Sequence, residues 1–212
     1  MKSCKFSLMA VLWVLFITVF TGCGGGGGSS DGGGTGSLSV SLQDSSMEYE
    51  AVYVTINQVQ VHIEGEKWED VMSPDKAGKT YNLLTLVNGV REELGIVDLT
   101  EGSYTQMRLI IGLQPDDGIN VLSEAHPFAN YVITKDDLVY HELKVPSGPQ
   151  TGIKIVHGFT ISEFETTELV LDFDAGKSVV KAGNSLLWLL KPTVKVSEVN
   201  EYAIVRGVVV DD

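Results

Sequence analysis

Apolar and polar residues alternate with a period of two through most of the chain after residue 36, which is the pattern of β-strands. The apolar positions that share one strand face are Leu38, Val40 and Leu42; Val52, Val54 and Ile56; Val59, Val61 and Ile63; Thr105, Met107, Leu109, Ile111 and Leu113; Ile153 and Ile155; Leu169, Leu171 and Phe173; and Val194 and Val196. Closely spaced turn signals between these runs favour antiparallel pairing. We therefore predict an all-β fold over residues 37–200, a mostly antiparallel β-sandwich of the immunoglobulin-like or prealbumin-like kind with one short helical segment.

The apolar face changes parity between Ile56 and Val59. A parity change inside one strand needs one extra residue, so the pattern predicts a β-bulge at Asn57 and Gln58. The alternative is two short strands with a break at the same place.

Residues 81–95 depart from the period of two. Five apolar residues recur there at helix-like spacing: Leu83, Leu84, Leu86, Val87 and Val90. Gly95 is a typical helix terminator, so we expect a short helix or helical turns in this segment.

The N-terminus has the pattern of a secretory signal. Lys2 and Lys5 precede an apolar run over residues 8–20, which is shorter than the roughly 18–20 residues of a membrane span. Thr21, Gly22 and Cys23 then resemble the lipobox of bacterial lipoproteins, although Phe20 stands where leucine is usual. The resemblance implies a signal peptide over residues 1–22 and a lipid on Cys23. An ordinary signal peptide with a chance cysteine and an uncleaved membrane anchor are the alternatives.

Residues 23–36 are predicted to form a lipidated cysteine followed by a flexible tether. Nine of the 13 residues after Cys23 are glycine, and such a chain reaches roughly 20 Å. Two or three acyl chains on Cys23 would hold the protein in a lipid bilayer. Gly24 follows where an aspartate would signal inner-membrane retention, so the resemblance implies the outer membrane of a Gram-negative cell envelope; a Gram-positive host stays open.

Charge and cysteine content exclude several classes of protein. The chain carries 15 basic and 28 acidic side chains, a net charge of -13, so we expect no nucleic-acid partner. Its two cysteines, Cys4 and Cys23, both lie in the first 23 residues and leave no disulfide scaffold for the domain.

Seven segments occur in an order that resembles a known family. They are SLSVSLQD, YEAVYVTINQVQVH, YNLLTLVNGV, EGSYTQMRLII, VPSGPQTGIKIVHGF, ELVLDFDAGKSVV and LLKPTVKV, spread over residues 37–197. Together they resemble the bacterial lipoprotein domain of unknown function labelled DUF four-three-eight-two. The family implies a secreted or surface β-sandwich, often tethered by a lipobox cysteine, and brings no activity and no catalytic residues.

The four histidines are predicted to lie in different surroundings. His62 shares parity with polar neighbours and should face solvent, and His126 precedes a proline and should lie in a loop. His141 is in a strand of unclear phase. His157 shares parity with Ile155, which predicts an inward, hydrogen-bonded structural side chain rather than a ligand or a general base.

Asp172 and Asp174 form the most suggestive pair of side chains. They lie two residues apart, so both should project from the face opposite Leu171 and Phe173. A solvated sheet face is the simplest interpretation. The alternatives are weak calcium binding and an acid/base pair, and no cofactor is otherwise expected.

These observations favour a surface-tethered, non-catalytic β-sandwich that binds an envelope protein or polysaccharide. One alternative is a metal-dependent hydrolase that uses Asp172, Asp174 and a histidine, and another is a structural subunit of an envelope assembly. In residues 202–210 both parities are apolar and Arg206 is the only charge, so residues 201–212 are expected to form a C-terminal strand or the remnant of a following domain.

Overall fold

The structure is a computed structural model, and it describes residues 33–44, 49–63, 65, 67–146, 151–183 and 186–199. The chain divides into two compact units, residues 1–32 and 33–212, and all the described residues belong to the second. Within the described residues, no helix combines the length and the apolar character that a membrane span requires.

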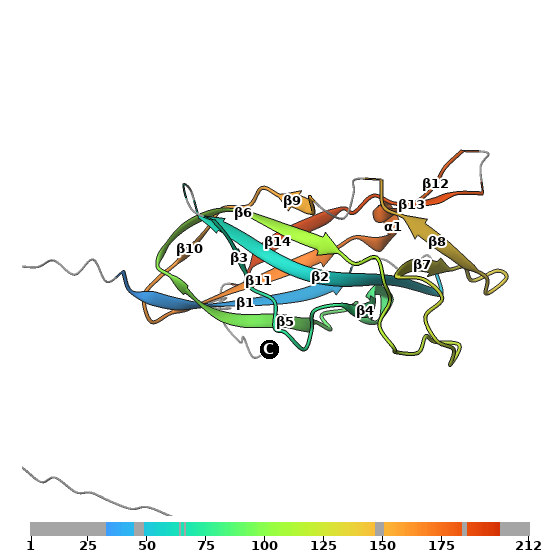
Figure 1. Ribbon diagram of the computed structural model, residues 1–212, viewed down its shortest axis with the longest axis horizontal. Helices are drawn as coiled ribbons and strands as arrows, with labels where there is room; N and C mark the ends of the chain where they lie inside the picture. The colour runs from blue at the N-terminus through green and yellow to red at the C-terminus, as the bar shows by residue number, and fades with distance from the viewer. Residues whose placement is uncertain are drawn as a thin grey trace, which may run out of the picture. The chain divides into compact units, whose positions relative to one another are not determined.

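The described residues form two packed sheets, which confirms the predicted sandwich-like, mostly β fold (Figure 1). The smaller sheet, called sheet A here, has the strand order β14-β11-β1-β5. Its strands are β1 (Thr35–Asp44), β5 (Glu92–Thr100), β11 (Thr166–Phe173) and β14 (Val194–Glu198). β1 pairs with β11 in parallel and with β5 antiparallel, so sheet A is mixed rather than purely antiparallel.

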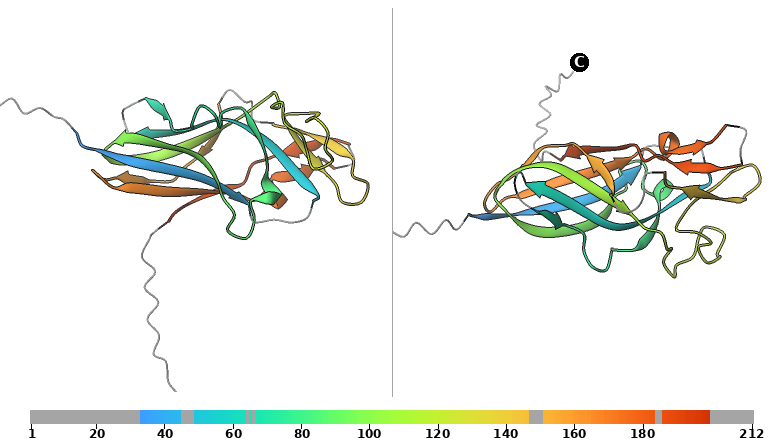
Figure 2. Two further views of the ribbon diagram at one scale, coloured as in Figure 1. Left: turned by 90° about the horizontal axis from the view of Figure 1, so that it is seen from below. Right: turned by 45° about the horizontal axis from the view of Figure 1, so that its top comes forward.

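The larger sheet, called sheet B here, follows the order β10-β6-β2-β7-β8-β13-β12, with β3 and β4 paired to β2 and β9 paired to β6. Its strands are β2 (Ala51–Ile63), β3 (Trp68–Asp70), β4 (Lys79–Asn82), β6 (Gly102–Ile111), β7 (Asn130–Ile133), β8 (Tyr140–Lys144), β9 (Ile153–Ile155), β10 (Phe159–Ile161), β12 (Val179–Lys181) and β13 (Trp188–Leu190). β2 is the longest strand, and different parts of it pair with β3, β4, β6 and β7. Figure 2 shows the packed sheets in two further views.

The main core lies between the two sheets and contains most of the predicted apolar positions; Thr105 is an exception, because Tyr104 rather than Thr105 is buried in this part of β6. Leu38, Val40 and Leu42 of β1 are fully buried, and so are the alternating valines of β2 that face them. A second, smaller core lies on the other side of β2, where Ala51 and Tyr53 pack with Tyr131 and Ile133. The first half of β2 is therefore buried on both faces, which alternation did not predict.

The predicted β-bulge is present in β2. The pairing of β2 with β6 shifts between Ile56 and Gln58, and β2 continues as one strand to Ile63. Val54 and Val59 consequently both point into the main core, because Asn57 is the extra residue. The alternative of two separate short strands is wrong.

The helix predicted over residues 81–95 is mostly wrong. Only Leu83–Thr85 form a 3-10 turn, η1, capped by the Asn82 side chain, and β5 already begins at Glu92. Gly95 lies inside β5, where an added Cβ would stand 2.3 Å from the Val71 carbonyl oxygen. The glycine is needed for this close approach of two backbones rather than for a helix end.

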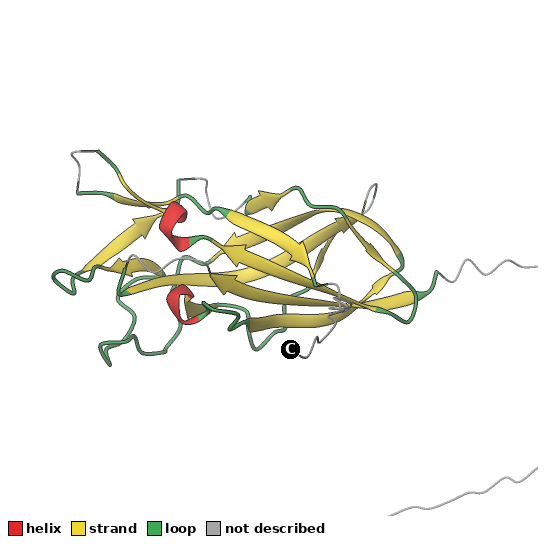
Figure 3. Ribbon diagram, turned by 180° about the vertical axis from the view of Figure 1, so that it is seen from behind, coloured by secondary structure: helices red, strands yellow, loops and turns green. Residues whose placement is uncertain are grey.

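Two further differences concern the ends of strands. A four-residue helix, α1 (Ala175–Ser178), follows β11 where no helix was predicted (Figure 3). Leu113 was expected to continue the apolar face of β6, yet β6 ends at Ile111 and Leu113 is 62% exposed.

Candidate functional site

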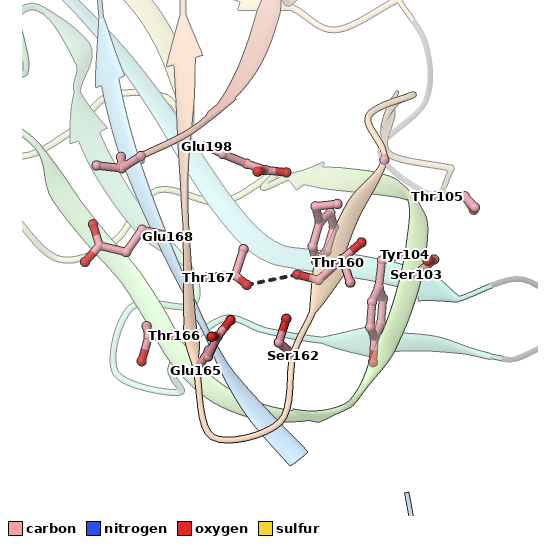
Figure 4. A pocket seen from close by; sticks show the side chains of 13 residues that line it. Ser103, Tyr104, Thr105, Thr160, Ser162, Glu165, Thr166, Thr167, Glu168 and Glu198 are labelled. Atoms are coloured by element: carbon pink, nitrogen blue, oxygen red, sulfur yellow. Dashed lines mark hydrogen bonds between the residues drawn. The ribbon is translucent and has the colours of Figure 1, made fainter. Parts of the chain in front are cut away.

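A polar groove of about 560 Å³ opens between the two sheets at one end of the sandwich (Figure 4). Its walls come from β6 and β10 of sheet B and from β11 and β14 of sheet A. The groove exists because β10 and β11 are consecutive in the chain but belong to different sheets, so the strands diverge after their connecting turn.

Hydroxyl and carboxyl groups dominate the lining of this groove. The polar side chains that line it are Ser103, Thr105, Thr160, Ser162, Glu165, Thr166, Thr167, Glu168 and Glu198. No lysine, arginine or histidine belongs to the described lining. Hydroxyl groups both donate and accept hydrogen bonds, and carboxylates only accept, so the groove presents mixed hydrogen-bonding capacity with negative charge.

Two aromatic rings form an apolar wall behind these polar groups. Tyr104 and Phe159 stack with ring centroids 5.2 Å apart, and both residues are buried. The Tyr104 hydroxyl donates a hydrogen bond of 3.1 Å to the Thr100 carbonyl, and burial raises the pKa of this phenol. Tyr104 therefore shapes the groove as a neutral structural side chain.

The turn between β10 and β11 is fixed by the start of β1. The Phe164 amide donates to the Thr35 carbonyl at 3.0 Å, and the Ser37 amide donates to the Glu165 carbonyl at 2.9 Å. An added Cβ on Gly36 would stand 2.1 Å from the Ser162 carbonyl oxygen, so only glycine fits there. The groove consequently lies beside the point at which the N-terminal chain enters the domain.

A hydrogen bond from a side chain joins the two walls of the groove. The Thr167 hydroxyl on β11 donates to the Thr160 carbonyl on β10 at 3.0 Å (Figure 4). This contact links the two sheets across the groove and limits how far its walls can separate.

Asp172 and Asp174 are both half-buried rather than fully exposed, and the hydrogen bond to Asp174 and the charges of both raise the pKa of Lys177. Asp172 lies on β11, half-buried, in register with Gln43 on one side and Lys195 on the other. Asp174 lies beyond the strand end and is the N-cap of α1, where its carboxylate accepts a hydrogen bond from the Lys177 amide at 3.0 Å. β11 ends at Phe173, so Asp174 is placed by the capping of α1 rather than by strand pairing.

A lysine lies near each of these carboxylates: Lys177 bonds Asp174, and Lys195 is the register partner of Asp172. The Lys177 ammonium donates to Asp174 Oδ2, and this bond is the main cause that lowers the pKa of Asp174 below its usual range. Only 15% of the Asp174 side chain is exposed. Among the described residues, no group of three or more His, Cys, Asp or Glu side chains is arranged to hold a metal ion.

His126 lies in a loop as predicted, but it is buried, and it belongs to a polar network that alternation could not reveal. A hydrogen bond of 2.7 Å joins its Nδ1 to the Tyr131 hydroxyl, and its Nε2 lies 3.6 Å from Asp116 Oδ1. Burial lowers the pKa of His126, and the Asp116 charge opposes that shift. The network closes over the smaller core, where the Val121 amide donates to the Tyr53 hydroxyl at 2.8 Å.

The other histidines differ in part from their predictions. His62 is half-buried rather than exposed, because the Trp68 ring lies against it at 4.9 Å. His141 is on β8 and stacks on Trp188 at 4.9 Å. His157 is half-buried in the loop between β9 and β10, and its buried Nε2 has no hydrogen-bond partner in the described part of the chain, so the predicted hydrogen-bonded role is wrong for this atom. None of the four histidines lines the groove.

Several sequence predictions concern parts of the chain that the structure does not describe. The lipidation of Cys23, the signal peptide over residues 1–22, most of the tether and the C-terminal segment 201–212 lie outside the described residues.

Comparison with protein families finds a match over the domain. The family described as "Domain of unknown function (DUF4382)" matches residues 35–192, which is most of the chain. No curated protein and no solved structure matches.

Proposed function

The chain belongs to the DUF4382 family, and we propose that it is a lipid-anchored, non-catalytic binding module of the bacterial cell envelope. Its ligand is a polysaccharide that the groove between the two sheets binds through sugar hydroxyl groups. The lipid is carried by Cys23, and the outer membrane is the proposed location because Gly24 follows the cysteine.

The lining of the groove is the observation that carries this proposal. Six serine and threonine residues and three glutamates, from both sheets, line one open cavity. A sugar presents several hydroxyl groups, each of which donates and accepts, so serine, threonine and glutamate side chains can satisfy them without a fixed charge on the ligand. The stacked, buried rings of Tyr104 and Phe159 hold the walls in place before any ligand arrives.

The entry point of the chain supports a role close to a membrane. The groove is lined by the β10–β11 turn, which bonds to Thr35 and Ser37 at the start of β1. If the glycine-rich segment between Cys23 and β1 is a flexible tether, as its sequence predicts, its reach is roughly 20 Å. A domain held by lipid on Cys23 would therefore present this groove to material within about one tether length of the membrane.

The structural roles of Asp172 and Asp174 favour binding over hydrolysis in this proposal. Asp172 and Asp174 were the residues on which the hydrolase alternative rested, and one caps a helix while the other lies in a strand. We therefore propose a binding role for the domain and assign no reacting group.

Binding to the groove is tested with the full chain by isothermal titration with uncharged hexose and N-acetylhexosamine oligosaccharides. The Ser162→Ala/Glu198→Gln variant should weaken binding at least tenfold, because it removes two groups from opposite walls. The control Ser41→Ala/Glu93→Gln changes the same residue types at paired positions of β1 and β5 away from the groove and should leave binding unchanged. Equal affinity in wild type and groove variant, or no binding at millimolar concentration, would refute the groove as a glycan site.

The anchor is tested separately by fractionation and intact-mass analysis. The mature chain should begin at a lipidated Cys23 and sediment with membranes, and Cys23→Ser should abolish both properties. An unmodified N-terminus at another residue would refute the lipid anchor without bearing on the groove.

A further inference from the structure

The outer face of sheet B carries an ordered set of polar side chains on four adjacent strands, in the order β3-β2-β6-β9. One row across these strands consists of Asp70, Gln60, Arg108 and Lys154, which the pairing registers place side by side. The next row contains Trp68, His62 and Gln106. We call these seven residues the β3-β9 platform.

The centre of the platform is held by contacts among its own side chains. The Arg108 Nε donates to Gln60 Oε1 at 2.5 Å, and the guanidinium carbon lies 4.4 Å from the centroid of the Trp68 ring. The same ring lies 4.9 Å from His62. Arg108 and Trp68 are both partly exposed, so a planar cation and an aromatic ring are fixed next to one another at the surface.

The two positive charges of the platform do not stabilise the fold. Arg108 and Lys154 are directly opposite each other on neighbouring antiparallel strands, where like charges destabilise the pair. Neither forms a salt bridge with any described carboxylate. The acidic residue of the row, Asp70, is separated from them by Gln60, and its Oδ1 accepts from the Met72 amide at 3.1 Å.

From this arrangement we propose that the β3-β9 platform binds an acidic polysaccharide, with Arg108 and Lys154 pairing with its carboxylates and Trp68 contacting its sugar rings. The platform shares no residue with the groove between the sheets, so this inference is independent of the proposed function. The uncompensated pair of cations is complementary to an anionic chain, although the protein as a whole carries a net charge of -13.

The remaining side chains favour a glycan over another polyanion. Gln60 and Gln106 each offer an amide donor and an amide acceptor, which sugar hydroxyls can satisfy together. The platform spans four strands about 4.8 Å apart, so it can accommodate several residues of an extended chain. Recognition of negative charge alone would not require these amide groups or the Trp68 ring.

The test is affinity electrophoresis of the full chain in gels that contain sodium polygalacturonate, with dextran gels as the uncharged comparison. We expect retardation by polygalacturonate and at least a tenfold weaker interaction for Arg108→Gln/Lys154→Gln. Lys154 is exposed and its side chain makes no hydrogen bond or salt bridge with the described residues, so Lys154→Gln alone keeps the fold and should weaken binding by several-fold. Its melting temperature should be unchanged or higher, because the like-charge pair is relieved.

The control Lys191→Gln/Lys195→Gln removes the same two charges outside the platform and should bind as the wild type does. An equal loss in this control would mean that overall charge, not the platform, determines binding, and would overturn the proposal. No interaction with polygalacturonate would overturn it as well. Stronger binding to poly-L-glutamate or to phosphatidylglycerol vesicles would replace the glycan by an acidic protein or an anionic membrane.

Discussion

The Nδ1 atom of His126 lies 2.7 Å from the hydroxyl oxygen of Tyr131 inside the smaller core, which the loop between β6 and β7 covers. His126 contacts the Tyr53 ring on one side and faces the Asp116 carboxylate at 3.6 Å on the other. A titratable ring thus closes a core that is built largely from aromatic side chains, and the stability of this end of the domain should depend on pH.

Lowering the pH from 7.5 to 5 should reduce the melting temperature. In the unfolded chain His126 has a pKa near 6.5, and burial lowers that pKa in the folded chain. Below about 6.5 the unfolded state therefore binds the proton first, so stability is complete above that pH and is lost as the pH falls toward the folded pKa. The comparison is a series of thermal melts of wild type and His126→Asn.

The melting temperature of His126→Asn should change less between pH 7.5 and pH 5 than that of the wild type. His141→Asn is the matched control, because His141 stacks on Trp188 at the surface of β8, outside the small core. If the melting temperature still depended on pH in His126→Asn but no longer did so in His141→Asn, the pH dependence could not be assigned to His126.

Removing the Tyr131 hydroxyl should destabilise the domain by roughly 1–3 kcal/mol, because Tyr131→Phe leaves the buried His126 Nδ1 without its partner. Urea denaturation measures this change. Tyr140→Phe, on the neighbouring strand and only partly buried, is the control and should cost less. Equal losses in the two variants would show that the hydrogen bond contributes nothing.

Gly95→Ala should cost about 1–3 kcal/mol, the usual range for forcing extra atoms into a packed region. The new Cβ would meet the Val71 carbonyl oxygen at 2.3 Å and the Ser73 nitrogen at 2.8 Å, and both atoms belong to backbone that cannot rotate away. Gly158→Ala is the control, since its nearest atom is 3.6 Å distant. Thermal melts that do not distinguish the two variants would argue against the close approach.

Asp174 is expected to act as a helix cap and not as a calcium ligand. Asp174→Ala should destabilise by about 1 kcal/mol, whereas Asp174→Asn keeps an acceptor for the Lys177 amide and should cost much less. Melting with and without millimolar calcium separates the two roles. A calcium-dependent rise in melting temperature that Asp172→Asn and Asp174→Asn each abolish would restore the metal hypothesis.

The strand faces and the bulge could be predicted from sequence because each depends on local parity. Ile56 and Val59 could both reach one core only if an extra residue separated them, and Asn57 is that residue. Alternation says nothing of what covers the opposite face. The burial of Tyr53 depends on a loop more than 60 residues further along the chain. The Val121 amide of that loop donates a hydrogen bond to the Tyr53 hydroxyl.

Misleading local signals explain the other differences. Gly95 follows a run of leucines and valines at helical spacing, but its role depends on the Val71 carbonyl of another segment. His126 precedes a proline, which predicts a loop but gives no sign that the loop packs over a core. The groove could not be predicted either, because its serines, threonines and glutamates come from four strands of two sheets.

The central position of β1 in sheet A has a mechanical consequence. β1 is bonded along its length to β11 on one side and to β5 on the other, and the chain from Cys23 joins it at Thr35. A force applied through that chain acts along the axis of β1, so the hydrogen bonds to β5 and to β11 are loaded in shear. Both sets of bonds must break together before β1 can leave the sheet. An edge strand would instead unzip one bond after another. A force applied at the N-terminal end of β1 would therefore be resisted by two ladders at once.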